Sequence, residues 1–340
     1  MTSVFSNFGT GTCSFSGKSG LVSYFTLGSA PPPPPPTDLY AFTTFVFSNA
    51  GATSNTGPTY AQVKSAYSAT AWTQNQSYLN VVTQGFQLWT VPTTANYTIQ
   101  IAGAAGGNYS TYSKGAGNVI SSTVSLTQGD LINICVGQTG TTGSGSIAAG
   151  GGGGSFVAWS NGTPITVAGG GGGTSTGYPT NGPGIDAVST TAGTKDGGAQ
   201  GTAGTNGSGG VTNTADGFLS SYGHGGGGAG FSGDGSTVTG GQTAWHGKGG
   251  LSFGNGLVGG ARGGGGLYGG TGGFGGGGGG GGTVSDTRSC SGGGGGYSGG
   301  AGGSVTSATD GGGGGGSYSI STITVIGRCT SNGYVRITKI

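Results

Sequence analysis

The chain has 340 residues; 91 of them are glycine and only 5% are charged, with ten lysine or arginine residues, eight aspartates and no glutamate. The formal net charge of +2 is spread too thinly to form a basic stripe, so the chain lacks the electrostatic footprint of a nucleic-acid-binding protein. No apolar stretch approaches the ~20 residues of a membrane-spanning helix, which argues against membrane insertion.

The first 36 residues divide into a small module and a spacer. Residues 1–30 carry short apolar stretches, such as Leu21–Leu27, between glycine-containing turns, and predict a β module that attaches to another protein. The six prolines of 31–36 predict a stiff spacer of about 19 Å, with a ligand for proline-binding domains as the alternative. Residues 1–19 lack the basic region of a secretory signal peptide.

Residues 37–340 predict an all-β fold, a jelly-roll-like β-sandwich that carries glycine-rich insertions. The strands expected in the sandwich are 42–47, 78–82, 86–91, 97–101, 118–124, 131–136 and a closing strand, 334–339. Buried strand fragments are expected between the glycine runs at 155–159, 165–168 and 318–320, followed by Ile323 and Val325–Ile326. One helix is predicted over 59–71, with Pro58 in its first turn.

The glycines are concentrated in the later part of the chain. Only eight precede residue 103, and the others include seven uninterrupted runs: Gly150–Gly154, Gly169–Gly173, Gly225–Gly228, Gly263–Gly266, Gly275–Gly282, Gly292–Gly296 and Gly311–Gly316. A Gly-X-Y period is absent, which excludes collagen. A disordered linker is the simple alternative, but the apolar stretches between the runs favour order. We therefore predict a bundle of polyglycine II helices over about 103–316, because only glycine lets neighbouring backbones touch.

Several motifs in a fixed order carry a resemblance to a known family: Trp89–Pro92, Tyr97–Gly107, Gly129–Gln138, Gly150–Val157, Ala168–Gly173, Gly272–Gly275 and Gly292–Gly300. Over roughly residues 86–340 they resemble the glycine-rich extracellular domain of anaplastic lymphoma kinase and leukocyte tyrosine kinase. The resemblance implies a β-sandwich whose insertions form polyglycine II helices. The family's domain binds protein ligands, but no kinase or membrane segment follows here, which argues against receptor signalling.

A second resemblance concerns the segments Asn49–Thr53, Thr56–Thr59 and Ala61–Tyr67. These segments look similar to glycine-rich proteins of large DNA viruses and phages, and tail-fibre adhesins of T-even-like phages also carry polyglycine II bundles. The resemblance implies a function by analogy alone.

Catalytic, cofactor and metal sites are not expected. The glycine motifs lack the following helix that a nucleotide site needs, and no cysteine pair has zinc-site spacing. For the four cysteines, Cys13, Cys135, Cys290 and Cys329, free thiols and disulfides both remain open. We therefore expect no enzymatic activity and no cofactor.

Aromatic residues and two histidines between the glycine runs are the candidate recognition residues: Tyr178, Tyr222, His224, Trp245, His246, Phe253 and Tyr268. The simpler interpretation is that they flank and cap the glycine bundle. The functional interpretation is that they form a recognition tip on connecting loops, around 222–224 and 245–248, because rigid scaffolds commonly present binding residues on loops.

These observations favour a structural protein on the exterior of a virus particle: a fibre, spike, tail-fibre tip or minor capsid component that attaches to the host. Its expected partners are other virion proteins at the N-terminal module and a host-surface protein or glycan, within an oligomer or larger assembly. The alternative is a secreted or cell-surface matrix or filament protein of a microbe.

Overall fold

The structure is a computed structural model that describes residues 37–53, 55–109, 112–142, 148–175, 182–197, 200–213, 222–264, 268–282, 289–304 and 311–340. The predicted N-terminal module, 1–30, and the spacer, 31–36, lie outside the described residues. The chain divides into two compact units, Met1–Thr37 and Asp38–Ile340. The second unit contains every element below.

The elements of the second unit follow one another in the order β1 (Thr44–Phe47), α1 (Tyr60–Ala66), η1 (Ala71–Gln74), β2 (Leu79–Asn80), β3 (Gln87–Thr90), β4 (Ala95–Ala102), β5 (Gly117–Leu126), β6 (Leu131–Cys135), β7 (Ser155–Trp159), β8 (Pro164–Ala168), η2 (Thr243–Trp245), η3 (Phe253–Asn255), β9 (Tyr318–Ser319), β10 (Thr324–Cys329) and β11 (Tyr334–Lys339). Here η denotes a short 3₁₀ helix.

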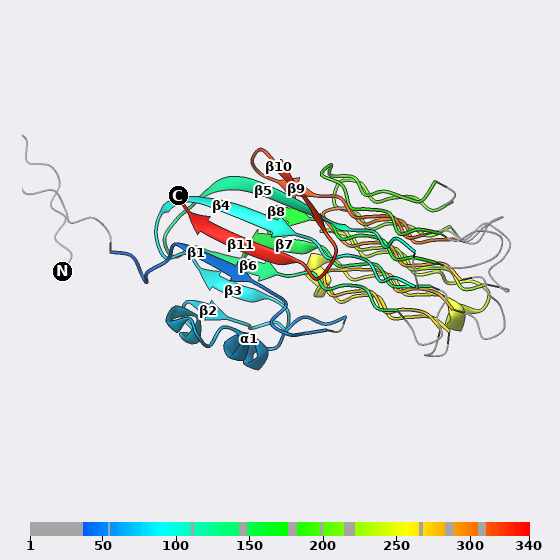
Figure 1. Ribbon diagram of the computed structural model, residues 1–340, viewed down its shortest axis with the longest axis horizontal. Coiled ribbons are helices and arrows are strands. Elements are labelled where there is room, and N and C mark those ends of the chain that lie inside the picture. The colour runs from blue at the N-terminus through cyan, green and yellow to red at the C-terminus, as the bar shows by residue number, and fades with distance from the viewer. Residues whose placement is uncertain are drawn as a thin grey trace, which may run out of the picture. The chain divides into compact units, whose positions relative to one another are not determined.

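The strands form two antiparallel sheets. The first sheet has the order β1-β11-β4-β5-β10 and the second the order β2-β3-β6-β7-β8-β9 (Figure 1). In the first sheet β11 lies between β1 and β4, with Phe47 opposite Val335 and Ile99 opposite Ile337. The predicted all-β sandwich is confirmed, and so is the return of the closing strand to it.

One hydrophobic core fills the space between the two sheets, because alternate residues of each strand point inward. The first sheet contributes the fully buried residues Phe47, Tyr97, Ile99, Ile101, Ile120, Val335 and Ile337. The second sheet contributes Leu79, Trp89, Ile132, Ile134, Val157 and Ile165, which are equally buried. Each large apolar side chain in such a core stabilises the fold by roughly 1.5–3 kcal/mol.

The helix α1 is shorter than the predicted 59–71. Thr59 is its N-cap: its hydroxyl accepts a hydrogen bond from the Gln62 N–H at 3.3 Å, and its own N–H donates to Gln62 Oε1 at 2.8 Å. This reciprocal capping box fixes the start of the helix, so Pro58 precedes the cap and does not lie in the first turn. The helix ends at Ala66, and 71–74 forms the separate turn η1.

The predicted burial of the segment around β10 is wrong. Val325 is 56% exposed and Ile326 is 52% exposed. The cause is topological, because β10 is an edge strand that pairs only with β5 in the first sheet. The segment 318–320 was also expected as a strand; β9 covers only Tyr318–Ser319 of it, and Ile320 is 46% exposed.

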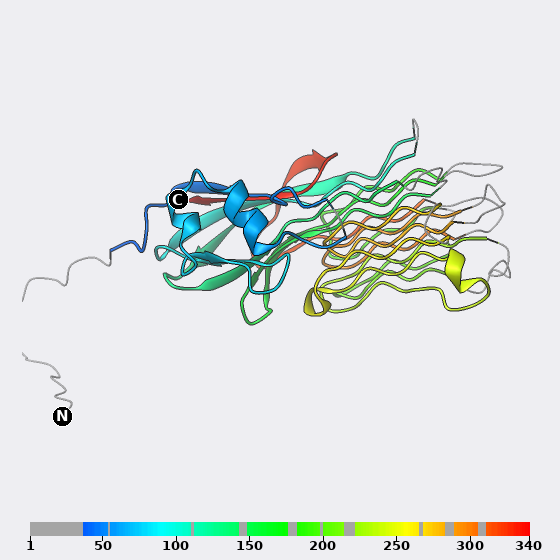
Figure 2. The ribbon, with the colours of Figure 1, turned by 90° about the horizontal axis from the view of Figure 1, so that it is seen from below.

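Beyond the sheets the chain forms what we call the glycine region, made of the segments 103–107, 137–140, 150–154, 169–173, 223–230, 275–282, 292–296 and 311–316. These segments carry no α-helix or β-strand, and they run side by side in both views (Figures 1 and 2). Three sheet strands lead directly into them: β4 into Gly103, β6 into Gly137 and β8 into Gly169. The sandwich and the glycine region therefore share continuous chain segments.

Hydrogen bonds in the glycine region repeat with a period of three residues. The N–H groups of Gly150–Gly154 donate, in order, to the carbonyl oxygens of Thr141, Gly278, Gly171, Gln138 and Gly275, at 2.8–3.0 Å. The first and fourth acceptors belong to one neighbouring segment, and the second and fifth belong to another. Each glycine segment is thus bonded on several sides to different neighbours, in contrast to a strand, which bonds to two.

The segments lie so close together that a side chain would not fit. A Cβ on Gly278 would lie 2.2 Å from the carbonyl oxygen of Gly226, and a Cβ on Gly313 would lie 1.9 Å from that of Thr194. Real Cβ atoms essentially never approach other atoms within 3.0 Å. Glycine is therefore required here by the close approach of backbones.

A second hydrophobic cluster joins the glycine region to the outer face of the second sheet. The sheet and its β2–β3 connection contribute Phe86, Cys135, Phe156, Ala158 and Val167, and the glycine-rich chain contributes Phe231, Phe253, Leu257 and Phe274. All nine are at most 9% exposed. One face of the second sheet is therefore covered by the sandwich core, and part of its outer face is covered by this cluster.

Candidate recognition surface

Phe253 takes part in the packing between the glycine region and the second sheet. Its ring stacks on that of Phe231, with 4.7 Å between centroids and 14° between planes, and meets Phe86 edge-on at 5.2 Å. It is 8% exposed. The side chain is occupied by packing and is not presented at the surface, as the capping interpretation of these aromatic residues expects.

His224 and His246 form a buried pair inside the glycine region. Both side chains are fully buried. The N–H of His224 donates to Nδ1 of His246 at 3.2 Å, and Nε2 of His246 lies 3.0 Å from the carbonyl oxygen of Gly240. These two contacts assign the proton of a neutral His246 to Nε2, because Nδ1 acts as the acceptor. The pair thus fixes backbone positions and does not reach the surface.

Three of the predicted recognition residues lie together: Tyr222, Trp245 and Tyr268, which we call the aromatic end. All three are half-buried. Gly282 lies between them, since its N–H donates to the Trp245 carbonyl at 2.8 Å and a Cβ on it would lie 2.6 Å from Cβ of Tyr268. A Cβ on Gly223, next to Tyr222, would lie 2.4 Å from the Gly282 nitrogen. Tyr178 lies outside the described residues.

The aromatic end lies far from the sheets. Figure 2 shows two short yellow helices at opposite ends of the glycine region. The helix η3 contains Phe253, which packs against the sheet, so η2 with Trp245 is the helix at the far end. Of the predicted recognition residues within the described part of the chain, the structure therefore brings three to this far end and buries the others.

Sequence reasoning missed an open groove of about 610 Å³ on the outer face of the second sheet. Its floor is formed by Leu88 of β3 and Asn133 of β6, which lie opposite each other in the sheet. Its walls are the β2–β3 connection around Val82, the β7–β8 turn around Asn161 and the η3 turn around Asn255. No local motif could have revealed this groove, because its lining comes from segments that only the fold brings together.

The polar groups of the groove are uncharged. They include the amides of Asn133, Asn161 and Asn255 and the hydroxyl of Ser160. Asn161 accepts a hydrogen bond from the Thr163 N–H at 2.9 Å, which holds it at the tip of the β7–β8 turn. The Asn133 side chain is half-buried and forms no hydrogen bond to any residue that the structure describes.

Asp234 supports the η3 wall of this groove from behind. Its carboxylate accepts hydrogen bonds from the Ser252 N–H at 2.7 Å and from Nδ2 of Asn255 at 2.9 and 3.0 Å. Burial alone would raise the pKa of Asp234, but these hydrogen bonds from Ser252 and Asn255 outweigh it and lower the pKa. The aspartate therefore stays ionised and orients the Asn255 amide.

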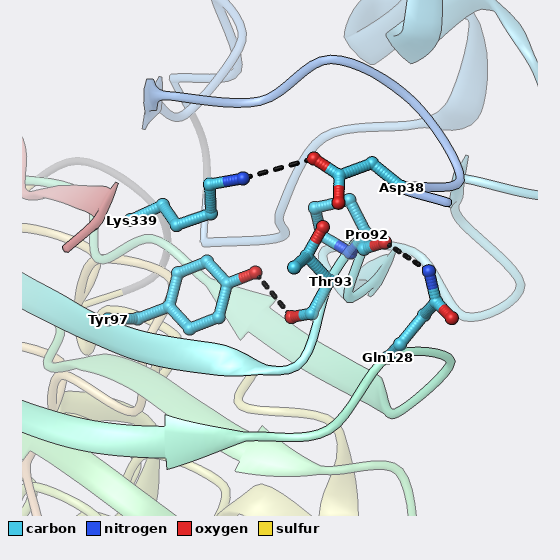
Figure 3. Close-up of polar contacts among 6 residues, drawn as sticks. All are labelled: Asp38, Pro92, Thr93, Tyr97, Gln128 and Lys339. Atoms are coloured by element: carbon cyan, nitrogen blue, oxygen red, sulfur yellow. Dashed lines mark hydrogen bonds and ion pairs between the residues drawn. The ribbon is translucent and has the colours of Figure 1, made fainter. Parts of the chain in front are cut away.

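A group of polar contacts secures the start of the second unit (Figure 3). The Asp38 carboxylate lies 3.0 Å from Nζ of Lys339 in β11, and Figure 3 shows both side chains next to Thr93. The neighbouring Thr93 hydroxyl and the Lys339 ammonium group lower the pKa of Asp38. We call the pair Asp38 and Lys339 the entry clasp, because it ties residue 38 to the last strand of the sandwich.

Backbone carbonyls beneath the entry clasp are also held. The Tyr97 hydroxyl donates to the carbonyl of Thr93 at 2.7 Å, and Nε2 of Gln128 donates to that of Pro92 at 2.8 Å (Figure 3). Burial raises the pKa of Tyr97 to about 12, so this hydroxyl remains a donor at neutral pH. The loop between β3 and β4 is thus fixed where residues 37–39 join the sandwich.

The three cysteines of the described chain are buried. Cys135 and Cys329 are free thiols, Cys290 is also buried, and Cys13 lies outside the described residues. Burial raises the pKa of the Cys135 thiol, so it packs as a small apolar group.

Within the described ranges no group of three or more His, Cys, Asp or Glu residues could hold a metal ion. Among those same residues, no helix has the length and apolar character needed to cross a membrane.

Comparison with known proteins gives one partial likeness. No known family model matches the chain. A stretch of 98 residues, 28% of the chain, is 35% identical to the leukocyte tyrosine kinase receptor of Mus musculus, and the match covers 11% of that receptor. The likeness to this receptor is therefore confirmed for part of the chain. The likeness to phage and large-virus proteins stays a prediction.

Proposed function

We propose that the chain is a structural protein on the exterior of a virus particle, a fibre, spike, tail-fibre tip or minor capsid component that contributes to host attachment. The observation that carries this proposal is the three-residue period of hydrogen bonds in the glycine region. Backbones that are bonded to several neighbours at once form a stiff body, and an attachment protein needs such a body to hold a binding surface away from its anchor.

The glycine segments in this proposal are polyglycine II helices. This helix has three residues per turn and no hydrogen bonds within its own segment, so its N–H groups point outward in three directions. The repeated acceptors of Gly150–Gly154 support that assignment, as does the same spacing in Gly312–Gly316, whose N–H groups at 312 and 315 donate to Gly173 and Gly170. A high-resolution experimental structure tests it: φ near −75° and ψ near +145° are expected in these segments.

Attachment through the N-terminus completes the proposed layout. Residues 1–30 bind another virion protein, and the proline spacer of 31–36 separates this module from the sandwich. The entry clasp of Asp38 and Lys339 supports this arrangement, because it ties the point of entry to β11, which is paired on both sides within the first sheet. The aromatic end then faces the host, where its half-buried rings offer stiff, amphipathic contact area.

The alternative function is a secreted or cell-surface matrix or filament protein of a microbe. A specific observation favours it: the edge strand β10 exposes Val325 and Ile326. Exposed apolar edge strands are templates for pairing with another chain, which is one way to build a filament. In neither case do we propose enzymatic activity or a cofactor.

Fractionation of the source material distinguishes the two candidates. The viral proposal predicts that mass spectrometry detects the chain in purified particles, and that antibodies against the aromatic end label intact particles in electron micrographs. Consistent absence from particles, with recovery from the extracellular matrix, would establish the alternative. The genes next to this one give a second test, with capsid or tail genes expected for the viral function and secretion genes for the matrix function.

A further inference from the structure

We infer that the groove on the outer face of the second sheet is a binding site for an uncharged saccharide. This inference names the class of ligand that the proposed attachment protein would bind. Only the biological purpose of the binding rests on the proposed function. The groove of about 610 Å³ lies within the range of ≈300–1,000 Å³ that is usual for ligand sites.

The apolar part of the groove suits the C–H faces of sugar rings. Leu88 on the floor is half-buried, and Val82 on the wall is 78% exposed. Phe86 and Phe253 also line the groove, and their edge-on contact with each other holds both rings in place. A ligand with one apolar face would remove the Val82 side chain from water.

The polar part of the groove suits hydroxyl groups. An asparagine amide can both donate and accept hydrogen bonds, and so can each sugar hydroxyl. Asn133 is the central group, because its half-buried amide lacks a hydrogen bond to any residue in the described ranges. A ligand hydroxyl can therefore replace water at this amide without breaking a hydrogen bond within the described part of the protein.

The charge of the groove excludes an ionic ligand. None of the residues that line it is charged. The nearby carboxylate of Asp234 is occupied by the Ser252 N–H and the Asn255 amide, so it orients Asn255 and leaves that residue's Oδ1 for the ligand. A sulfated or sialylated sugar would meet no cation here.

A peptide strand fits the groove less well than a saccharide. Peptides commonly bind by adding a strand to a free sheet edge. The floor strands β3 and β6 pair with each other and with β2 and β7, so both lie inside the sheet and offer no free edge. The groove thus presents side chains to its ligand, and these side chains match hydroxyl groups.

Saturation-transfer NMR and calorimetry on the full chain test the inference. Asn161 begins the sequence Asn-Gly-Thr (161–163), which is an acceptor site for N-glycosylation. The protein is therefore produced in bacteria without N-glycosylation, so that Asn161 carries no attached sugar. The probes are lactose, maltotetraose, cellotetraose, mannobiose and chitobiose, with sialyllactose and a heparin tetrasaccharide as charged probes. At least one uncharged probe is expected to bind, and the charged probes are expected to bind more weakly.

Variants then locate the binding. Asn133→Ala removes the amide on the floor of the groove and is expected to weaken binding about fivefold to tenfold, which corresponds to the loss of one hydrogen bond. Val82→Asp should weaken it at least as much, by placing a charge on the apolar wall. Asn96→Ala and Val46→Asp are the matched controls, because both lie on strands of the first sheet and away from the groove.

Three results would overturn the inference: no uncharged probe binds at millimolar concentration, a charged probe binds best, or the control variants weaken binding as much as the groove variants do. This test can fail or succeed independently of the test of the proposed function. Binding is measured on the isolated chain and can hold even when virus particles lack the protein, whereas a particle protein without sugar binding would leave the viral role intact.

Discussion

The sandwich and the glycine region depend on opposite properties of their residues. In the sandwich, large side chains such as Trp89 and Tyr97 fill the space between two sheets. Where glycine runs face one another in the glycine region, no side chain stands between the backbones, and the N–H and C=O groups bond across the contact. The first region is therefore sensitive to the removal of atoms and the second to their addition.

The comparison also explains why one chain can combine both regions. Hydrophobic burial stabilises the sandwich, whereas the glycine region gains from hydrogen bonds between backbones that have been removed from water. Glycine loses much conformational freedom on folding, so the glycine region has a large entropic cost. The cluster around Phe253 and Phe274 connects the two, and apolar burial there offsets part of that cost.

The largest effect is expected from a cavity in the sandwich. Trp89→Ala should destabilise the protein by about 3–5 kcal/mol, because Trp89 is fully buried and packs against Phe42 and Tyr97. Chemical denaturation followed by circular dichroism measures the change. The matched control is Trp245→Ala at the aromatic end, where the side chain is half-buried. An equal loss in the free energy of unfolding for both variants would contradict the distinction between the buried Trp89 and the half-buried Trp245.

The next effect tests the glycine region by adding a methyl group. Gly278→Ala should destabilise by about 2–3 kcal/mol, because its Cβ would lie 2.2 Å from the Gly226 oxygen and would separate hydrogen-bonded backbones. Gly313→Ala should behave alike, with its Cβ at 1.9 Å from the Thr194 oxygen. Differential scanning calorimetry should record a lower Tm for both.

Gly197→Ala provides the control for this experiment. Gly197 is exposed, and a Cβ on it would meet nothing within 4 Å. Alanine there should leave stability unchanged or raise it by up to about 1 kcal/mol, because it restricts the unfolded chain. An unchanged or higher Tm for Gly278→Ala would mean that the glycine runs behave as linkers.

A smaller effect is expected at the junction of the two regions. Phe253→Leu should cost about 1–2 kcal/mol, since Phe253 stacks on Phe231 and is nearly buried. Hydrogen exchange should accelerate at 251–257 and 274–276 and stay unchanged in β4 and β5. Ile99→Val, in the sandwich core, is the control with a similar cost. If Phe253→Leu also accelerated hydrogen exchange in β4 and β5, the sandwich and the glycine region would open together, which contradicts the prediction.

The smallest expected effect is a pH dependence at Asp234. Its pKa is lowered in the folded protein, so its contribution to stability is present above the unfolded pKa near 3.8 and is lost as the pH falls through the folded pKa. Asp234→Asn should therefore lower Tm at pH 7, with a loss in the free energy of unfolding of less than about 1 kcal/mol, because the group is largely solvent-screened. In strong acid the variant and the wild type should unfold at the same temperature. A difference in Tm that persists in strong acid would show that the effect comes from altered hydrogen-bond geometry and not from the charge of Asp234.

Much of the sandwich could be predicted because the local sequence pattern identifies its strands. β7 at Ser155–Trp159 and the closing strand β11 agree with prediction, since each alternates buried and exposed residues or forms a short apolar run between turn residues. The helix α1 was found but predicted too long, because helical spacing gives no sign of where a short helix ends. Exposure of Val325 was missed because a strand pattern does not tell an edge from a centre.

The candidate sites were less accessible to prediction for a physical reason. Tyr222, Trp245 and Tyr268 were identified as residues standing between glycine runs, but the same signal also selected His224, His246 and Phe253, which are buried. An aromatic residue is equally suited to a core and to a binding surface. The groove left no signal at all, because its lining residues lie far apart along the chain and are ordinary surface types.

The sequence alone determined that this is an all-β protein whose glycines serve close contact between backbones. Local alternation defines strands, and long glycine runs between apolar stretches have few other ordered uses. Tertiary structure decided which sheet faces are covered. It also decided that β10 is an edge strand and that part of the outer face of the second sheet forms an open groove. Those outcomes depend on contacts between residues that are distant in sequence, and no local pattern records such contacts.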